Sequence, residues 1–510
     1  MLPKSSRTSN TCKHESLCFT STSNAQKFGY SRPNLEKRLA AATPNRILNP
    51  SRTPQDDDDS RDSKIYPAPL VLPSSEISLY PHEEGQSLRS WLKNNGVNKI
   101  TPERKTIYIS LPPGFGEDVK FMKGWTMPKG ATKSAKRGLG LDYELVAKYV
   151  EAFYHGLEVK VLPDGWFSWI LDQDESSGKS EGRAKAKTSS KSRSRSKTKS
   201  RSIDLETEPE DPQIGLRSKD STEYTVVRSR PTPNYPYSNQ LNLNDILDFA
   251  IASLPDDAYA LLMLLEHDLY EDDDDEFVCG RAYGGSRVSV MSGARYWPGF
   301  DEEENVERVH GWPASHCEAH LDTFLGEEGT TRKGKAQTTK GDLVDLDAGT
   351  TSQSEKMTPL HRAVQVYIAP STPKSLTLLH LARIARTASH ELGHCFGIGH
   401  CTYYACIMQG SAGLAEDASQ PPYLCPVDEA KILRATAKGV VSERRLEGWK
   451  EERLSVMKRF CRGVVEEWGA DGRGSMFECL GEWITGLLED VDQTGGRGVD
   501  RVVIDLTMND

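Results

Sequence analysis

The stretch His390–His400, HELGHCFGIGH in one-letter code, contains three histidines whose spacing predicts a metal centre. Two histidines four positions apart lie on one face of a helix, so His390 and His394 can reach the same metal ion. Gly397 offers the left-handed conformation that ends a helix, which lets the chain turn and bring His400 back as a third ligand. Three imidazoles with one position left for water are the arrangement of a catalytic zinc site.

The helix that carries the first two histidines is predicted to begin at Thr372-Pro373, an N-cap followed by a first-turn proline. Glu391 stands beside the first ligand and can abstract a proton from water bound to the metal. Three capping or surface histidines without a metal are the alternative interpretation. The added requirement of Gly at the eighth position and His at the eleventh makes a chance match rare.

The motif continues beyond His400 with Cys401, Cys406 and Met408, and Cys425 follows later. This extended pattern resembles that of the archaemetzincins, a family within the metzincin zinc proteases. The resemblance implies an α/β, zincin-like metzincin fold, in which a mixed twisted sheet lies over the active-site helix. It also implies a cleft along an edge strand, for which residues 288–291 are our candidate.

The same resemblance implies a role for each residue of the histidine motif. The three histidines would bind catalytic zinc, the glutamate would be the general base, and the methionine would form an apolar floor beneath the metal; in this chain these are His390, His394 and His400, then Glu391, then Met408. The implied reaction is hydrolysis of a peptide bond by Glu391-assisted attack of zinc-bound water.

A second, structural zinc held by four cysteines is also implied by the resemblance. Cys401, Cys406 and Cys425 match the first three positions, whereas Asp428 stands at the fourth, a substitution that we expect of a fungal-type member. Closed zinc sites strongly favour thiolate and imidazole, although aspartate can bind zinc through oxygen. Three alternatives therefore stand: Asp428 is the fourth ligand, another residue or water completes the site, or there is no second zinc.

The remaining cysteines do not show the spacing of metal ligands. Cys395 lies between two of the histidines and is expected to pack inward. The others are scattered along the chain: Cys12, Cys18, Cys279, Cys317, Cys461 and Cys479.

Composition limits the class of protein. The chain has 510 residues, a formal net charge of −10 and 36% hydrophobic residues, below the roughly 45–50% apolar content of compact domains. No apolar run approaches the roughly 18 residues that a membrane helix needs, and the amino terminus lacks the apolar segment of a secretory signal. We therefore expect an intracellular, monomeric protein of the cytoplasm or nucleus that is neither secreted nor bound to a membrane.

Changes in composition along the chain predict its domain organisation. We expect a disordered region over 1–64, a metallopeptidase domain over 65–435 with disordered insertions at 174–235 and 326–357, a helical extension over 436–492 and a flexible tail over 493–510. Hydrophobic periodicity predicts strands over 106–111, 157–162, 258–265, 277–280, 288–291 and 363–369. It predicts helices over 141–154 and 241–254, and two more beyond 441 separated by the glycine-rich stretch 469–474.

Two segments favour interactions with other macromolecules. The tail residues Val503, Ile504, Asp505 and Leu506 resemble a SUMO-interacting motif, in which a short apolar strand is added to the edge of the modifier's sheet. A last strand of the domain or a plain tail is the alternative. Residues 179–201 hold ten Lys and Arg without interleaved aromatics, so a nucleic-acid contact would be to phosphate. A nuclear signal, a phosphorylation target or a solvated insertion would give the same composition.

Together these patterns predict a zinc-dependent metallopeptidase acting on peptides or proteins, as an aminopeptidase or an endopeptidase. The alternative is a non-catalytic, zinc-stabilised adaptor that binds SUMO or nucleic acid. An intact Glu391 argues against that alternative, because a scaffold has no chemical need for a general base.

Overall fold

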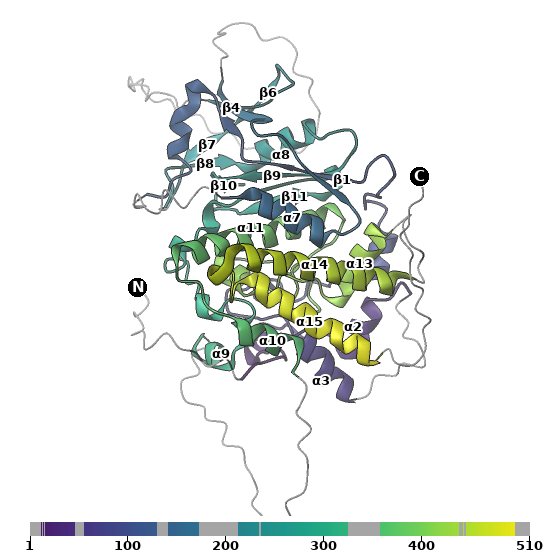
Figure 1. The fold of residues 1–510 in the computed structure, drawn as a ribbon. Coiled ribbons are helices and arrows are strands. Elements are labelled where there is room, and N and C mark those ends of the chain that lie inside the picture. The colour runs from purple at the N-terminus through teal and green to yellow at the C-terminus, as the bar shows by residue number, and fades with distance from the viewer. Residues whose placement is uncertain are drawn as a thin grey trace, which may run out of the picture.

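The computed structural model describes residues 16–45, 56–129, 141–172, 213–233, 236–324, 357–437 and 445–494, together with Cys12, His14 and Ser442. The strands form the upper part of the molecule and most helices pack beneath them (Figure 1). The protein is therefore a mixed α/β structure in which a helical layer supports a sheet.

The apolar run that the sequence predicts as a strand, β9 (Ala258–Leu265), is the centre of the main sheet and is buried along its whole length. It pairs in parallel with β1 on one side and with β12 on the other, while the outer strand β11 runs antiparallel to β12. In spatial order the strands are β11 (Gly280–Tyr283), β12 (Val288–Ser292), β9, β1 (Thr106–Ser110) and β3 (Glu158–Val161).

Alternation along β9 separates two hydrophobic cores. Ala260, Leu262 and Leu264 belong to the larger core, which contains the helices beneath the sheet. Leu261, Met263 and Leu265 point to the opposite face and belong to a smaller core. Because neighbouring residues of a strand point to opposite faces, a sheet covered on both sides needs a continuous apolar run at its centre.

The smaller core lies between the main sheet, the helix α8 (Leu243–Ala252) and a second, four-stranded sheet. The strands of the second sheet are β2 (Gly114–Phe115), β4 (Phe167–Leu171), β5 (Ile214–Ser218) and β6 (Tyr224–Val227). A third, three-stranded sheet contains β10 (Asp268–Tyr270), β8 (Asn239–Asn242) and β7 (Ser229–Pro231).

Beneath the main sheet lie α7 (Tyr143–Phe153) and α11 (Pro373–Cys395), with α14 (Leu446–Trp468) and α15 (Met476–Thr494) below them (Figure 1). The remaining α-helices are α1 (Ser23–Lys27), α2 (Leu35–Ala41), α3 (Asp56–Ile65), α4 (Glu76–Leu79), α5 (Leu88–Lys93), α9 (Glu318–Phe324), α10 (Pro359–Val366), α12 (Leu414–Ser419) and α13 (Pro426–Thr436). Short 3₁₀ helices connect several of them: η1 (Glu117–Gly124), η2 (Gly284–Ser286), η3 (Ala294–Tyr296), η4 (Pro298–Phe300), η5 (Arg308–His310), η6 (Ala314–His316) and η8 (Gly469–Asp471).

The amino-terminal region differs from the disorder expected over 1–64, because its described part forms helices that pack on the domain. The hydroxyl of Tyr30 donates to the carbonyl of Thr402 at 2.7 Å. Arg38 is buried and pairs with Asp59 and Asp62 at 2.7 and 2.8 Å. A polar composition usually favours disorder, but here the ion pairs of Arg38 stabilise the folded form of this region.

Two further expectations are wrong for the described residues. Part of the insertion expected over 174–235 forms β5, β6 and β7, which add to the second and third sheets. Residues 363–369 are not a strand, because α10 extends through Val366 and begins after the N-cap Thr358. The alternation of Val364 and Val366 suggests a strand, but the residues form a helix. Leu360, Ala363 and Val364 are buried on one face of that helix.

The two carboxy-terminal helices are confirmed on either side of residues 469–474, but they are not an appended extension. Met457, Cys461 and Trp483 belong to the same core as α7 and α11. The ring of Trp483 stacks on that of Tyr423 with 4.0 Å between centroids. The domain expected over 65–435 therefore includes these helices.

Some expectations fall outside the described residues. These are the insertion over 326–357 except for its last residue, the basic stretch 179–201 and the tail motif at 503–506. Within the described part of the chain, no helix combines the length and apolar character needed to cross a membrane.

Candidate metal centres

The helix α11 delivers the first two histidines of the motif, as the sequence predicts. Thr372 caps its first turn in a reciprocal pair with Ser375, and Pro373 occupies the first helical position. The helix ends at Cys395, and Gly397 has a φ of +72°, the left-handed conformation that favours glycine. The chain therefore turns back and places His400 beside His390 and His394.

Met408 lies against the same helix at Gly393. A Cβ atom at position 393 would stand 2.4 Å from the sulfur of Met408, so a side chain larger than hydrogen would collide with it. Met408 is fully buried, and its carbonyl accepts a hydrogen bond from the amide of Cys401 at 2.8 Å. Glycine inside the motif thus lets the loop 401–408 pass directly along the helix.

The three imidazoles converge on one point. The candidate ligand atoms of His390, His394 and His400 lie within 4.8 Å of one another, and the two Nε2 atoms of His390 and His394 are 3.0 Å apart. A single ion can therefore reach all three nitrogens.

The other ring nitrogen of each histidine is held by the protein. His390 Nδ1 donates to the carbonyl of Ile407, and His394 Nδ1 donates to that of Ile398, both at 2.7 Å. Because carbonyl oxygens only accept, Nδ1 carries the proton in both rings and the facing Nε2 atoms carry lone pairs. Two lone pairs 3.0 Å apart repel one another unless a cation lies between them, so the donor set fits zinc.

Glu76 holds the third histidine, and sequence reasoning missed it. Its Oε1 accepts from His400 Nδ1 at 2.6 Å, across 324 positions of sequence. The amide of Glu76 in turn donates to Glu416 Oε2 at 2.9 Å. No local signal marks Glu76, because α4 is one short turn far from the motif.

Burial and neighbouring charges shift the pKa values of these histidines in different directions. Burial, with the neighbouring imidazoles, holds the pKa of His390 well below its usual range, and burial lowers that of His394 to about 4. Burial also opposes protonation of His400, but the hydrogen bond and negative charge of Glu76 outweigh it and raise the pKa of His400. The first two imidazoles are therefore neutral, the form that binds metal.

Glu391 lies beside this cluster and is only 7% exposed. Burial raises the pKa of its carboxyl to about 7, although the positive charges of His400 and Arg281 oppose this shift. A carboxylate with a pKa near neutrality can both accept and release a proton at physiological pH.

A cavity of about 700 Å³ opens above the histidines and Glu391. One wall is formed by residues 276–282, which lead into and include most of β11. The prediction that residues 288–291 form the edge strand is wrong. These residues belong to β12, which lies between β9 and β11, and β11 forms the edge of the sheet. The strand pair expected at 277–280 and 288–291 does form, but its first strand begins only at Gly280.

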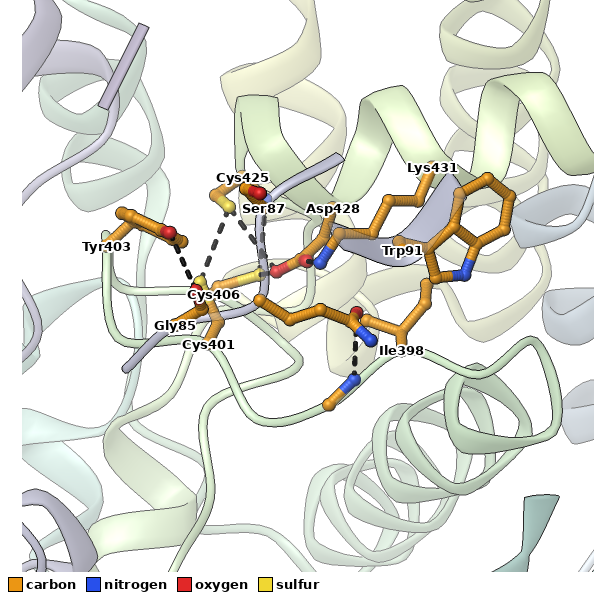
Figure 2. Close-up of polar contacts among 12 residues, drawn as sticks. Gly85, Ser87, Trp91, Ile398, Cys401, Tyr403, Cys406, Cys425, Asp428 and Lys431 are labelled. Carbon is orange, nitrogen blue, oxygen red and sulfur yellow. Dashed lines mark hydrogen bonds and ion pairs between the residues drawn. The ribbon is translucent and has the colours of Figure 1, made fainter. Parts of the chain in front are cut away.

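The second predicted cluster also comes together. Cys401, Cys406, Cys425 and Asp428 are all buried, and their candidate ligand atoms lie within 4.8 Å of one another (Figure 2). Asp428 Oδ2 lies 3.3 Å from the sulfur of Cys406 and 3.5 Å from that of Cys425. The Asp428 carboxylate therefore occupies the fourth corner of the group.

Lys431 approaches Asp428 from the side away from the sulfurs (Figure 2). Its Nζ lies 2.7 Å from Asp428 Oδ1, and both side chains are 1% exposed. Burial raises the pKa of Asp428 to about 7, helped by the charge of Cys401 and opposed by that of Lys431. One carboxylate oxygen is thus paired with an ammonium group, and the other faces the sulfurs.

The segment that precedes β1 clamps the loop between the two clusters. The Gln86 amide donates to the carbonyl of Gly397 at 2.9 Å and accepts from the amide of Gly399 at 3.2 Å. The indole of Trp91 donates to the carbonyl of Phe396 at 2.8 Å. In the view of Figure 2, Trp91 and Ile398 lie on the side of Lys431, and Asp428 stands between them and the cysteines. The turn that returns His400 is therefore fixed by side chains from far upstream.

Comparison with known proteins matches this region to one family. Residues 363–433 match the model of Peptidase family M54. This range includes all residues of the histidine and cysteine clusters but not Glu76, the partner of His400. Archaemetzincin-2 of Homo sapiens is 29% identical over 276 residues, 53% of this chain and 63% of that protein. Archaemetzincin-2 of Macaca fascicularis is 27% identical over 248 residues, 48% of this chain and 55% of that protein.

This chain thus spans a little over half the length of the mammalian relatives. The crystal structure of archaemetzincin from Methanopyrus kandleri aligns with 66% of this chain and 98% of its own, with 14% identity and a TM-score of 0.27.

Replacing Glu76 with Gln should weaken metal binding at the histidine cluster about 10–100-fold, the usual cost of losing a partner of a metal-ligating histidine. The amide keeps the shape but removes the charge that orients and polarises His400. Competition with a zinc chelator measures the affinity. Glu84→Gln, at an exposed position of the same segment, should leave it unchanged, and an unaltered affinity in Glu76→Gln would contradict the assignment.

Proposed function

Since this chain belongs to Peptidase family M54, the archaemetzincins, we propose that it is a zinc metallopeptidase whose metal is held by His390, His394 and His400. The observation that carries the proposal is the convergence of three nitrogens, two with Nδ1 fixed by backbone carbonyls and one by Glu76, at the floor of a cavity beside Glu391. The same proposal covers the zincin-like fold, with a mixed sheet over the helix that carries the site.

Glu391 is the proton carrier of the proposed reaction. Zinc, when bound, supplies Lewis-acid polarisation of a carbonyl and lowers the pKa of water. Glu391 accepts a proton from the attacking water and delivers it to the departing amine. Its burial supports this role, because a carboxyl group with a pKa near 7 exchanges protons in both directions.

The edge strand β11 positions the substrate in this proposal. Among the described residues β11 pairs on one side alone, with β12, and residues 276–282 line the cavity. An extended peptide can add to such an edge through main-chain hydrogen bonds, which accept many sequences. Peptides and unfolded protein segments are therefore the substrate class.

The lining of the cavity favours basic substrates. Five carboxylates face it, from Glu76, Glu271, Glu276, Glu391 and Asp417, against the guanidinium groups of Arg281 and Arg386. Arg281 pairs with Glu271 at 2.6 Å, and Arg386 pairs with Asp417. When the two positive charges of a bound zinc are counted with the two arginines against the five carboxylates, about one negative charge remains, so an acidic peptide still meets a net repulsion.

The second cluster is proposed as a structural zinc site with Asp428 as fourth ligand. Three sulfurs and one carboxylate oxygen form a closed, buried donor set, as structural zinc sites require. Lys431 supports this role by pairing with Oδ1 while Oδ2 stays directed at the sulfurs. This cluster would hold in place the loop that supplies His400.

Location in the cytoplasm or nucleus and a monomeric state remain proposals. The adaptor alternative depends on residues 503–506 and 179–201, which lie outside the described residues. We therefore keep the peptidase as the one candidate function.

Replacing Glu391 with Gln should abolish turnover while zinc is retained, because the amide cannot accept a proton. The expected loss is about 10²–10⁴-fold or more in kcat. Wild type and variant are incubated with a peptide pool that has free and blocked amino termini, and products are read by mass spectrometry. Equal cleavage by both proteins would overturn the role of Glu391, and the positions of the cuts distinguish an aminopeptidase from an endopeptidase.

A peptide with lysines flanking the scissile bond should be cleaved about tenfold faster at low salt, in kcat/KM, than the same peptide with glutamates. Glu276→Gln should narrow this ratio, whereas Glu303→Gln, at an exposed position away from the cavity, should not. Added salt should narrow it too, by screening the charges. A preference for the glutamate peptide would contradict the electrostatic argument.

Asp428→Asn should lower zinc affinity at the cysteine cluster by about tenfold or more, because it removes an anionic donor. Lys431→Met is the matched control, since it removes the ion pair but leaves the carboxylate. Chelator competition on both variants separates the roles. Equal losses would mean that Asp428 serves Lys431 alone, and no loss in Asp428→Asn would mean that another group completes the site.

A further inference from the structure

A third group of cysteines and histidines lies away from both clusters described above. Cys12 and His14 come from the amino-terminal segment, while His310 ends η5 and Cys317 follows η6. Cys12 and Cys317 are 305 positions apart in the sequence, and so no spacing rule could connect them. Their lack of ligand spacing in the sequence therefore does not prevent them from meeting in the fold.

The distances suit one shared metal ion. The candidate ligand atoms of all four residues lie within 4.8 Å of one another, and the two sulfurs are 3.4 Å apart. Two thiolates on one zinc, each about 2.3 Å from the metal, stand about 3.8 Å apart in tetrahedral geometry. The observed separation is near that value and well above the ~2.05 Å of a disulfide bond.

Two imidazole nitrogens in this group are buried polar atoms without a hydrogen-bond partner among the described residues. They are His14 Nδ1 and His310 Nδ1. Burying a polar atom without a partner costs free energy, so such atoms call for a specific explanation. A metal ion bound by both nitrogens supplies it.

The surroundings of His310 resemble the outer shell of a metal site. Its Nε2 lies 3.9 Å from a carboxylate oxygen of Glu307, which leaves Nδ1, the nitrogen without a hydrogen bond among the described residues, to bind a metal. The ring of His320 stacks on that of His310 at 4.3 Å between centroids. A carboxylate on the far nitrogen orients a metal-ligating histidine and raises its basicity.

Backbone pairing brings the two halves of the group together without the metal. Leu17 forms an antiparallel bridge with Cys317. The amide of Cys18 donates to the carbonyl of His316 at 2.7 Å, and that of Glu318 donates to Ser16 at 3.0 Å. The ligands are thus positioned in advance by a short strand-like contact.

We propose that Cys12, His14, His310 and Cys317 bind a structural zinc ion that fastens the amino-terminal segment to the loop 307–317. Two thiolates and two imidazoles form a closed tetrahedral set with no position open for substrate. The loop leads back to α11, because Asp301 pairs with both Arg308 and Arg383. The ion therefore secures a support of the helix that carries the histidine motif, and the inference does not depend on peptidase activity.

Zinc content tests the proposal on the full-length protein. The double variant Cys12→Ser/His14→Ala should contain about one zinc ion fewer per chain than wild type, measured by plasma mass spectrometry after dialysis. Cys18→Ser is the matched control, since Cys18 lies in the same segment and its sulfur contacts Thr20 instead. Equal zinc in wild type and the double variant would overturn the site.

Thiol alkylation of the folded wild type provides a second test that needs no variant. Cys12 and Cys18 are both partly exposed, so each should react with iodoacetamide unless it is bound. We expect Cys12 to react only after a chelator is added and Cys18 to react throughout. Reaction of Cys12 without chelator would overturn the proposal, as would release of Cys12 by a reductant alone, which would identify a disulfide with Cys317.

Discussion

The contact between Met408 and Gly393 is the constraint on which the arrangement of both the histidine cluster and the cluster of Cys401, Cys406, Cys425 and Asp428 depends. With only a hydrogen at position 393, the loop 401–408 lies directly along α11. That placement brings the carbonyl of Ile407 to His390 and lets Cys401 pair with Met408 through the backbone. Since Cys401 follows His400 and Cys406 precedes Ile407, the cysteine cluster holds both ends of the loop that orients the histidines.

Two carboxylates in this region meet a positively charged or proton-donating side chain. Glu76 accepts from His400, and Asp428 meets Lys431. Isolated charges in such surroundings would be strongly destabilising, whereas paired and hydrogen-bonded ones are tolerated. Asp428 and Lys431 lie one turn apart on α13, whereas the bond from His400 to Glu76 joins distant segments and so also fixes how they pack.

The sequence alone predicts what is encoded locally. The spacing of the histidines, the cap at Thr372 and the turn at Gly397 are all short-range features, and the structure has them where they were expected. The continuous apolar run of β9 likewise predicts a central strand. The features that the sequence could not predict depend on contacts between distant residues. They are the hydrogen bond from His400 to Glu76, the position of β11 at the edge of the sheet, and the proximity of Cys12 to Cys317. Residues 363–366 are predicted as a strand but form part of a helix, because valines at alternate positions fit both a strand and one face of a helix.

The origin of Glu76 and Gln86 has a consequence for biosynthesis. Both precede the first strand of the main sheet, whereas the groups they hold follow its last strand by about a hundred residues. A growing chain emerges from the ribosome amino terminus first, so these two side chains must wait until the whole main sheet and α11 have been made. The histidine centre therefore cannot be completed on a nascent chain that has exposed only its first three quarters. The proposed hydrolytic site therefore cannot cleave the first three quarters of its own polypeptide while they emerge and fold.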